Sequence, residues 1–223
     1  MKQLLTHLLI SSLAMSPCAT AQANSNTSAA SSAEYAVEQV SEDEARELYE
    51  AAPQSVRNVF IFYFAHLYAC MGKTVAEQDE DSVDSAYFDI FVDQAIYQDI
   101  PSAITKELPS EYAQYLTALA QIWTAALAEA DALSGEAANE ETYQAILDKT
   151  SATELALIDS YPQAVSLTEK LMPHLVTILF DACQMDDTLE NASEELQSST
   201  SSEKEYYAKV LDFMGETLFG LIQ

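Results

Sequence analysis

Apolar side chains recur at spacings of three and four residues through one unbroken stretch between Pro109 and Leu133. This spacing places them on one face of an α-helix, since a helix turns once every 3.6 residues. The stripe consists of Tyr112, Tyr115, Leu116, Leu119, Ile122, Trp123, Ala126, Leu127, Ala130 and Leu133. At 1.5 Å per residue, the predicted helix is roughly 36 Å long. A helix with one apolar face needs other helices to cover it, so the pattern favours a helical fold.

The composition agrees with a helical fold. Glycine occurs only 4 times in 223 residues, while alanine, the best helix former, is abundant. Tight hairpins and phosphate-binding loops need glycine, so the composition argues against an all-β fold and a glycine-rich nucleotide site. The formal net charge is −27. Charge of this sign repels phosphate, which excludes nucleic acid and an anionic membrane surface as partners.

Further helices are expected on both sides of the central one. A short helix starts at Ser41, and longer ones cover 53–71, 82–100, 139–161 (in two pieces), 160–185 (kinked at Pro173) and 202–222. Capping boxes at Ser41, Ser151 and Ser202 mark helix starts, and Gly72 and Gly135 mark helix ends. The polar stretch 191–201 is predicted to be a break. The fold class is therefore all-α, a single antiparallel bundle of about six to eight helices joined by short connections.

The N-terminal residues predict export. Lys2 is followed by the mostly apolar stretch 4–15 and by Ala21-Gln22-Ala23, a small-x-small site that signal peptidase accepts. The apolar run is too short to span a membrane. We therefore expect residues 1–23 to be a secretory signal peptide of a periplasmic or secreted bacterial protein with no integral membrane span. Residues 24–40 are expected to form a flexible polar leader, and 41–223 the acidic helical domain.

Cys18 offers an alternative N-terminal processing. It stands where a bacterial lipoprotein carries its lipid anchor, and a polar tether follows it. Pro17 occupies the preceding position, where a small residue is expected. We therefore favour cleavage after Ala23 over lipidation of Cys18.

Either form of processing leaves one pair of cysteines, Cys70 and Cys183. An even pair in an exported chain predicts a disulfide. If region 139–161 makes one pass, the helices 53–71 and 160–185 run parallel and both cysteines lie at the same end of the bundle. If that region makes two passes, the cysteines lie at opposite ends, beyond the Cα separation of about 7 Å that a disulfide can bridge.

Candidate ligands for a metal or cofactor are sparse. His66 and His174 lack the Glu-x-x-His pattern of di-iron bundles, so we interpret His66 as a core residue and His174 as part of a solvated face. We predict no cofactor. The loop containing Asp79, Glu80, Asp81 and Asp84 has the oxygen density that Ca²⁺ requires, but it lacks the glycine and the closing glutamate of an EF-hand. Weak Ca²⁺ binding there is the alternative to a solvated helix start.

Catalytic patterns are also weak. No Gly-x-Ser-x-Gly motif occurs. Asp89 and Asp93 stand at i and i+4, a spacing that could serve acid/base chemistry, but chance alone produces such pairs among 36 acids. We favour a protein that is not an enzyme, and a hydrolase or redox enzyme is the third alternative after the two functions below.

Two functions fit the acidic charge. In the first, the protein is a binding, inhibitor or immunity-type module whose surface attracts a cationic protein or peptide. In the second, a bundle core holds a small ligand or metal, and the acidic surface is an adaptation to a salty medium. One dense acidic face bordered by tyrosines would favour the first function, and charge spread over every exposed face would favour the second.

Overall fold

The computed structural model describes residues 40–77 and 85–223, and no β-strand occurs among them. The described helices are α2 (Glu42–Ala51), α3 (Gln54–Glu77), α4 (Ser85–Asp99), α5 (Ser102–Thr105), α6 (Ser110–Asp131), α7 (Glu140–Leu155), α8 (Pro162–Cys183), α9 (Met185–Ser198) and α10 (Glu203–Phe219). Short 3₁₀ turns, η2 (Gly135–Ala137) and η3 (Ala156–Asp159), flank α7. The predicted all-α helical bundle is confirmed.

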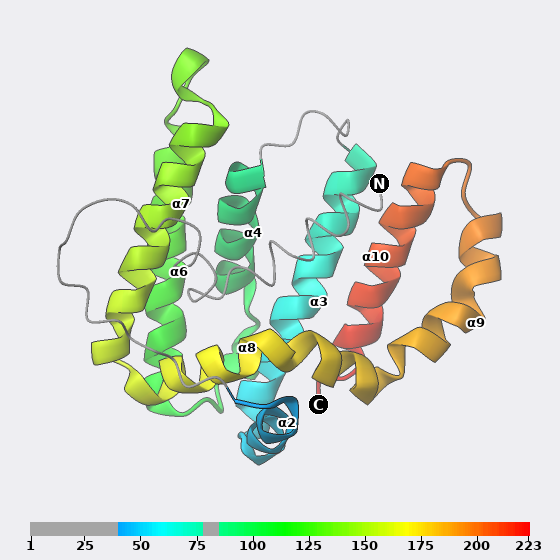
Figure 1. Ribbon diagram of the computed structural model, residues 1–223, viewed down its shortest axis with the longest axis horizontal. Helices are drawn as coiled ribbons and strands as arrows, with labels where there is room; N and C mark the ends of the chain where they lie inside the picture. The colour runs from blue at the N-terminus through cyan, green and yellow to red at the C-terminus, as the bar shows by residue number, and fades with distance from the viewer. Residues whose placement is uncertain (1–39, 78–84) are drawn as a thin grey trace.

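Most of the longer helices are aligned, but α8 is not (Figure 1). The helices α3, α4, α6 and α7 alternate in direction, and α10 packs along α3 in the opposite direction. Figure 1 shows α8 crossing this row at a steep angle, with α2 and α9 beside it. The bundle therefore has an antiparallel layer and one helix that lies across it.

Helix α3 is the centre of the core, as its uniformly apolar sequence predicts. The contact between α3 and α10 is the most extensive one between any two described helices. Within the described residues, α3 is also the one helix that is long and apolar enough to cross a membrane, over Gln54–Ala76. More than half of that window, 56 %, is buried inside the protein, as in the core helix of a soluble bundle. Length and composition alone do not distinguish the two roles.

The prediction that Gly72 ends this helix is wrong, because α3 continues to Glu77. Gly72 instead lies against α10, where an added Cβ would stand 2.9 Å from the carbonyl oxygen of Ala208. Gly215 of α10 has the reciprocal role, since a Cβ there would lie 2.8 Å from the carbonyl oxygen of Ala65. The two glycines allow close approach of α3 and α10.

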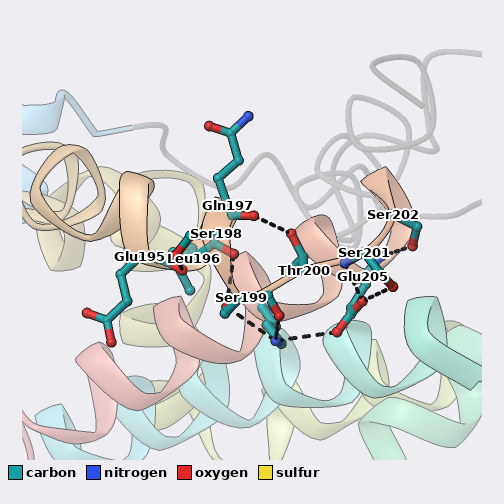
Figure 2. A network of polar contacts seen from close by, with 10 residues as sticks. Glu195, Leu196, Gln197, Ser198, Ser199, Thr200, Ser201, Ser202 and Glu205 are labelled. Carbon is teal, nitrogen blue, oxygen red and sulfur yellow. Dashed lines mark hydrogen bonds and ion pairs between the residues drawn. The ribbon is translucent and has the colours of Figure 1, made fainter.

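Two of the three predicted capping boxes do begin helices. The Ser41 hydroxyl accepts a hydrogen bond from the amide of Glu44 at 3.3 Å, and that of Ser202 accepts one from Glu205 at 3.1 Å. At the second start, the Glu205 carboxylate also accepts bonds from the amide and hydroxyl of Ser201 (Figure 2). Ser151 is not a cap, because it lies inside α7, which Asn139 caps instead.

The predicted polar break at 191–201 is mostly helical, since α9 runs to Ser198. The chain bends earlier, at Gln184, which adopts the left-handed conformation (φ 49°, ψ 50°) between α8 and α9. Asp186 and Asp187 then occupy the first turn of α9, where negative charge complements the helix dipole.

Candidate functional site

Three carboxyl groups from two neighbouring helices gather on the inner side of the bundle. Asp89 and Asp93 stand one turn apart on α4, and Glu154 lies in the last turn of α7, which packs against α4. The i, i+4 spacing puts both aspartates on one side of their helix. Asp93 is only 4 % exposed. Burial of a carboxylate to this degree is costly unless the group is paired or protonated.

A tyrosine from the central helix holds Asp93. The Tyr63 hydroxyl donates a hydrogen bond to Oδ1 of Asp93 at 2.8 Å. Burial, with the negative charge of Asp93, raises the pKa of Tyr63 well above its usual value, so this hydroxyl stays a donor. Burial raises the pKa of Asp93 to about 7; the charge of Glu154 adds to the shift, and the bond from Tyr63 opposes it.

The other two carboxyls are perturbed in the same direction. Burial raises the pKa of Asp89 to about 7, and the charges of Asp93 and Glu140 add to this shift. Burial also raises the pKa of Glu154 to about 7, and Glu169 contributes in the same direction. The carboxyls therefore reinforce one another's protonation.

Two buried polar atoms beside Glu154 lack hydrogen-bond partners among the described residues: Nε1 of Trp123 on α6 and Oε1 of Glu169 on α8. Trp123 is 3 % exposed. Its N–H lies near enough to Glu154 to lower the pKa of that carboxyl, yet Nε1 makes no hydrogen bond with a described residue. An unsatisfied buried polar group costs about 1–3 kcal/mol. This region therefore retains polar groups at the expense of stability.

Aromatic rings surround the carboxyls. The rings of Tyr63 and Tyr97 lie 5.9 Å apart, and burial raises the pKa of Tyr97 well above its usual value, with Glu154 and Asp93 contributing. Burial and Glu154 also raise the pKa of Tyr115 on α6. We call the set the acid–aromatic cluster; it consists of Tyr63, Asp89, Asp93, Tyr97, Tyr115, Trp123 and Glu154.

The chemistry open to this cluster is limited. Within residues 40–77 and 85–223, no three histidine, cysteine or acidic side chains come close enough to hold a metal ion. Asp93 is too deeply buried for a polymer such as a glycan to reach it. The cluster can bind and release protons, and this is the property that its geometry supports.

The remaining acids lie mainly on the outside, and their distribution is uneven. The ends of α2 and α9 adjoin the last turns of α8: Arg46 of α2 contacts Asp181 of α8 at 2.7 Å, and α9 begins one residue after α8 ends. We call the exposed acids of α2, of α9 and of the last turn of α8 the acidic corner; they are Glu42, Asp43, Glu44, Glu47, Glu50, Asp181, Asp186, Asp187, Glu190, Glu194 and Glu195.

By contrast, the outer face of α6 is almost uncharged before its last turn. A shallow groove of about 390 Å³ lies there, and its lining carries no charged side chain. It is lined by Ser110, Ala113, Gln114, Thr117, Ala118, Gln121 and Tyr161. The groove contains no group that would act as a catalytic acid, base or strong nucleophile.

The structure contains Cys70 and Cys183 as free thiols, so the predicted disulfide is not formed. The expected pairing required α3 and α8 to run parallel, whereas α8 crosses the row of aligned helices (Figure 1). The Cys183 sulfur contacts the Phe180 carbonyl oxygen of its own helix at 3.6 Å. Burial raises the pKa of both thiols, which keeps them protonated and weakly nucleophilic.

The two histidines pack as parts of the fold. His66 stacks on Phe62 with ring centroids 5.4 Å apart, and burial lowers its pKa. His174 differs from the solvated position expected for it, because its Nε2 lies 3.0 Å from the carbonyl oxygen of Val40, just before α2. His174 thus helps to attach α2 to α8.

Several sequence-predicted residues fall outside the described part of the chain. These are Cys18, the cleavage site at Ala23 and the Ca²⁺ candidates Asp79, Glu80, Asp81 and Asp84. The acid–aromatic cluster was missed from the sequence, where Asp89 and Asp93 stood out only as one of many acid pairs. A signal for Asp93 was available, since it lies within an apolar stretch beside Val92. Glu154 carried no comparable signal.

No protein-family model matches this chain, and no curated protein or solved structure shows significant similarity to it.

Proposed function

We propose that the protein is an exported, non-catalytic binding module, of the inhibitor or immunity type, that recognises a cationic protein or peptide. The observation that carries this proposal is the acidic corner. Helix α2 carries five exposed acids and one arginine, which is already paired with Glu42 and Asp181. Helix α9 carries five exposed acids and no basic residue. Such a surface attracts cationic partners and speeds their association.

The uneven distribution of charge supports docking over a uniform solvation coat. The exposed residues of α8 before Asp181 and of α6 before Glu129 are uncharged; they include Gln114, Thr117, Gln121, Gln163, Ser166, Pro173 and Thr177. The charged side chains on these stretches, Glu111, Glu169 and Lys170, are partly buried. An adaptation to salt would be expected to place acids on these faces as well. Most of the described tyrosines, however, lie in the core or pack against it. Tyr206 and Tyr207, with ring centroids 5.7 Å apart at the start of α10, are the partly exposed pair nearest in sequence to α9.

Binding of a short lysine-rich peptide, measured by calorimetry at low salt, tests the docking surface. The triple variant Glu190→Gln/Glu194→Gln/Glu195→Gln removes three charges from the acidic corner. The matched control Glu136→Gln/Glu141→Gln/Asp148→Asn removes three exposed charges at and before α7. We expect the first variant to weaken binding by about tenfold or more and the control by less than about twofold. Equal losses would show that the charge acts only as a coat.

The intact mass of the native protein, purified from its host with and without reductant, tests the predicted export. Cleavage after Ala23 would give one defined mass, and a lipid on Cys18 would give another. A two-hydrogen difference on reduction would indicate that Cys70 and Cys183 pair in the host. Retention of residues 1–23 in the native protein would contradict the exported assignment.

A further inference from the structure

The contact between α4 and α7 contains ionisable acids, and the described groups that shift their pKa values are other acids, Tyr63 and Trp123. Asp93 of α4 is almost completely buried and bonds to Tyr63, and Glu154 of α7 is close enough to disfavour its ionisation. Lys149 of α7 pairs with Glu129, on the exposed outer side of the helix. Two carboxylates at this contact would therefore repel each other, and water screens Asp93 little, although Glu154 is partly exposed.

The groups that face the two carboxyls from the surrounding helices are themselves neutral or acidic. They are Tyr63 on α3, Asp89 and Tyr97 on α4, Tyr115 and Trp123 on α6 and Glu169 on α8; Glu140 of α7 acts on Asp89, and Asp159 of η3 is exposed. Tyr63 donates a hydrogen bond to Asp93. The Trp123 N–H lies near Glu154 but makes no hydrogen bond with a described residue, so the stabilisation of a Glu154 carboxylate is incomplete.

We propose that the α4–α7 contact is a pH-sensitive joint, closed while at least one of Asp93 and Glu154 is protonated and loosened when both are ionised. Partner binding and this joint involve different acids, because those of the acidic corner lie outside the bundle. The joint would connect the local stability of α4 and α7 to pH. Helices α3 and α10, which pack through small and apolar side chains, would keep their contact.

The direction of the pH dependence follows from the raised pKa values. An unfolded aspartate or glutamate titrates near pH 4, whereas these carboxyls titrate near pH 7 in the folded protein. Their protonated forms contribute stability fully below about pH 4, and this contribution is lost as the pH rises to about 7. Each proton retained only by the folded state changes the unfolding equilibrium about tenfold per pH unit in this window. His66, whose pKa is lowered, acts in the opposite direction.

Hydrogen exchange of the full chain, followed by mass spectrometry at about pH 5 and about pH 8, tests the joint. After correction for intrinsic exchange rates, we expect amides of α4 and α7 to lose at least about tenfold in protection at the higher pH and to be less protected there than those of α3 and α10. Equal protection of α4 and α7 at both pH values would overturn the proposal.

Variants assign the effect to these two carboxyls. Asp93→Asn/Glu154→Gln cannot ionise at these two positions, so most of the difference in α4 and α7 protection between the two pH values should disappear; the part that remains is assigned to Asp89, whose pKa is also raised to about 7. Asp93→Asn keeps an oxygen that can accept the Tyr63 bond. The control Glu141→Gln/Asp148→Asn removes two exposed charges of α7 and should retain the wild-type difference. If the control abolishes the difference as completely as the core variant does, general charge repulsion is the cause and the proposal fails.

A measurement on the unmodified protein covers the case in which the core variant does not fold. The infrared band of protonated carboxyl groups should persist in the folded protein above about pH 6 and disappear near pH 7, after exposed acids have ionised. If that band has vanished by about pH 5, the carboxyls are ionised inside the closed bundle and the joint does not exist.

Discussion

Two helix contacts in this protein are built in opposite ways. Between α3 and α10, Gly72 and Gly215 carry no side chain. The two helices therefore lie so close that a Cβ added at either glycine would meet a backbone oxygen of the other helix. Between α4 and α7, Asp93 and Glu154 bring ionisable groups into the interior. The first contact depends on shape and the second on protonation.

The difference teaches how one acidic chain can hold regions of unequal stability. Close packing gains dispersion contacts at every pH, and Asp212, an acid beside the α3–α10 contact, is exposed to solvent. Buried carboxyls lose stability when they ionise. We therefore expect α3 and α10 to form the more stable part of the fold, and the stability of α4 and α7 to depend on pH.

The largest effect is expected from filling the α3–α10 contact. In Gly215→Val, the new side chain would meet the carbonyl oxygen of Ala65, and backbone atoms cannot move aside as a flexible side chain can. The free energy of unfolding should fall by about 3 kcal/mol, measured by urea denaturation. The control Ala125→Val, on the exposed side of α6, should cost less than about 1 kcal/mol. Similar losses in both variants would mean that α3 and α10 are not closely packed.

An intermediate effect is expected from removing the donor to Asp93. Tyr63→Phe leaves that buried carboxyl without its hydrogen bond, so the free energy of unfolding should fall by about 2 kcal/mol at pH 8. The pKa of Asp93 should rise further, because the lost bond had stabilised the carboxylate. The loss should therefore be smaller at about pH 5, where the carboxyl is protonated. Denaturation at both pH values checks this, with Tyr207→Phe as the partly exposed control; a loss independent of pH would contradict it.

A smaller effect is expected at the start of α10. Ser202→Ala removes the side chain that accepts the Glu205 amide bond (Figure 2), which should cost about 1 kcal/mol in a thermal or urea melt. The cost should be the same at about pH 6 and about pH 8, unlike that of Tyr63→Phe. Ser202→Asp, which retains a capping oxygen, should restore most of the stability. A failure of Asp to restore it would show that the cap is not what Ser202 contributes.

The smallest effect is expected from surface charge. Arg46→Gln breaks the ion pairs with Glu42 and Asp181, both of which are exposed to solvent. The Tm should decrease slightly at low salt, and the difference from wild type should vanish at about 1 M salt. The pH effect at the buried carboxyls should survive that salt concentration, because the interior is screened less. If salt abolishes both effects, the distinction between inner and outer acids is wrong.

Much of the local structure could be predicted from the sequence. The apolar stripe of α6, the uniformly apolar α3 and the caps at Ser41 and Ser202 are patterns within a few residues of one another, and the structure contains all of them. The positions of helix ends were harder to predict than the helices themselves. Gly72 resembled a terminator, but its lack of a side chain serves the contact with α10, which no local pattern reveals.

The candidate site could not be predicted in the same way. Asp93 and Glu154 are far apart in the sequence, and only the packing of α4 on α7 brings them into electrostatic contact. The sequence predicts the negative charge of the acidic corner but not where on the surface these acids gather. Its position depends on α2 and α9 meeting the end of α8.

The sequence by itself determined that this protein is helical, acidic and poor in nucleotide-binding or metal-binding patterns, because periodicity, capping and composition act over short range. The tertiary structure alone decided that α8 crosses the aligned helices, that Cys70 and Cys183 remain unpaired, and which acids face inward. These outcomes depend on chain direction at a few connections, such as the left-handed Gln184, where a residue without a marked preference for that conformation turns the chain. Long-range packing selects that conformation, and no short sequence pattern specifies it.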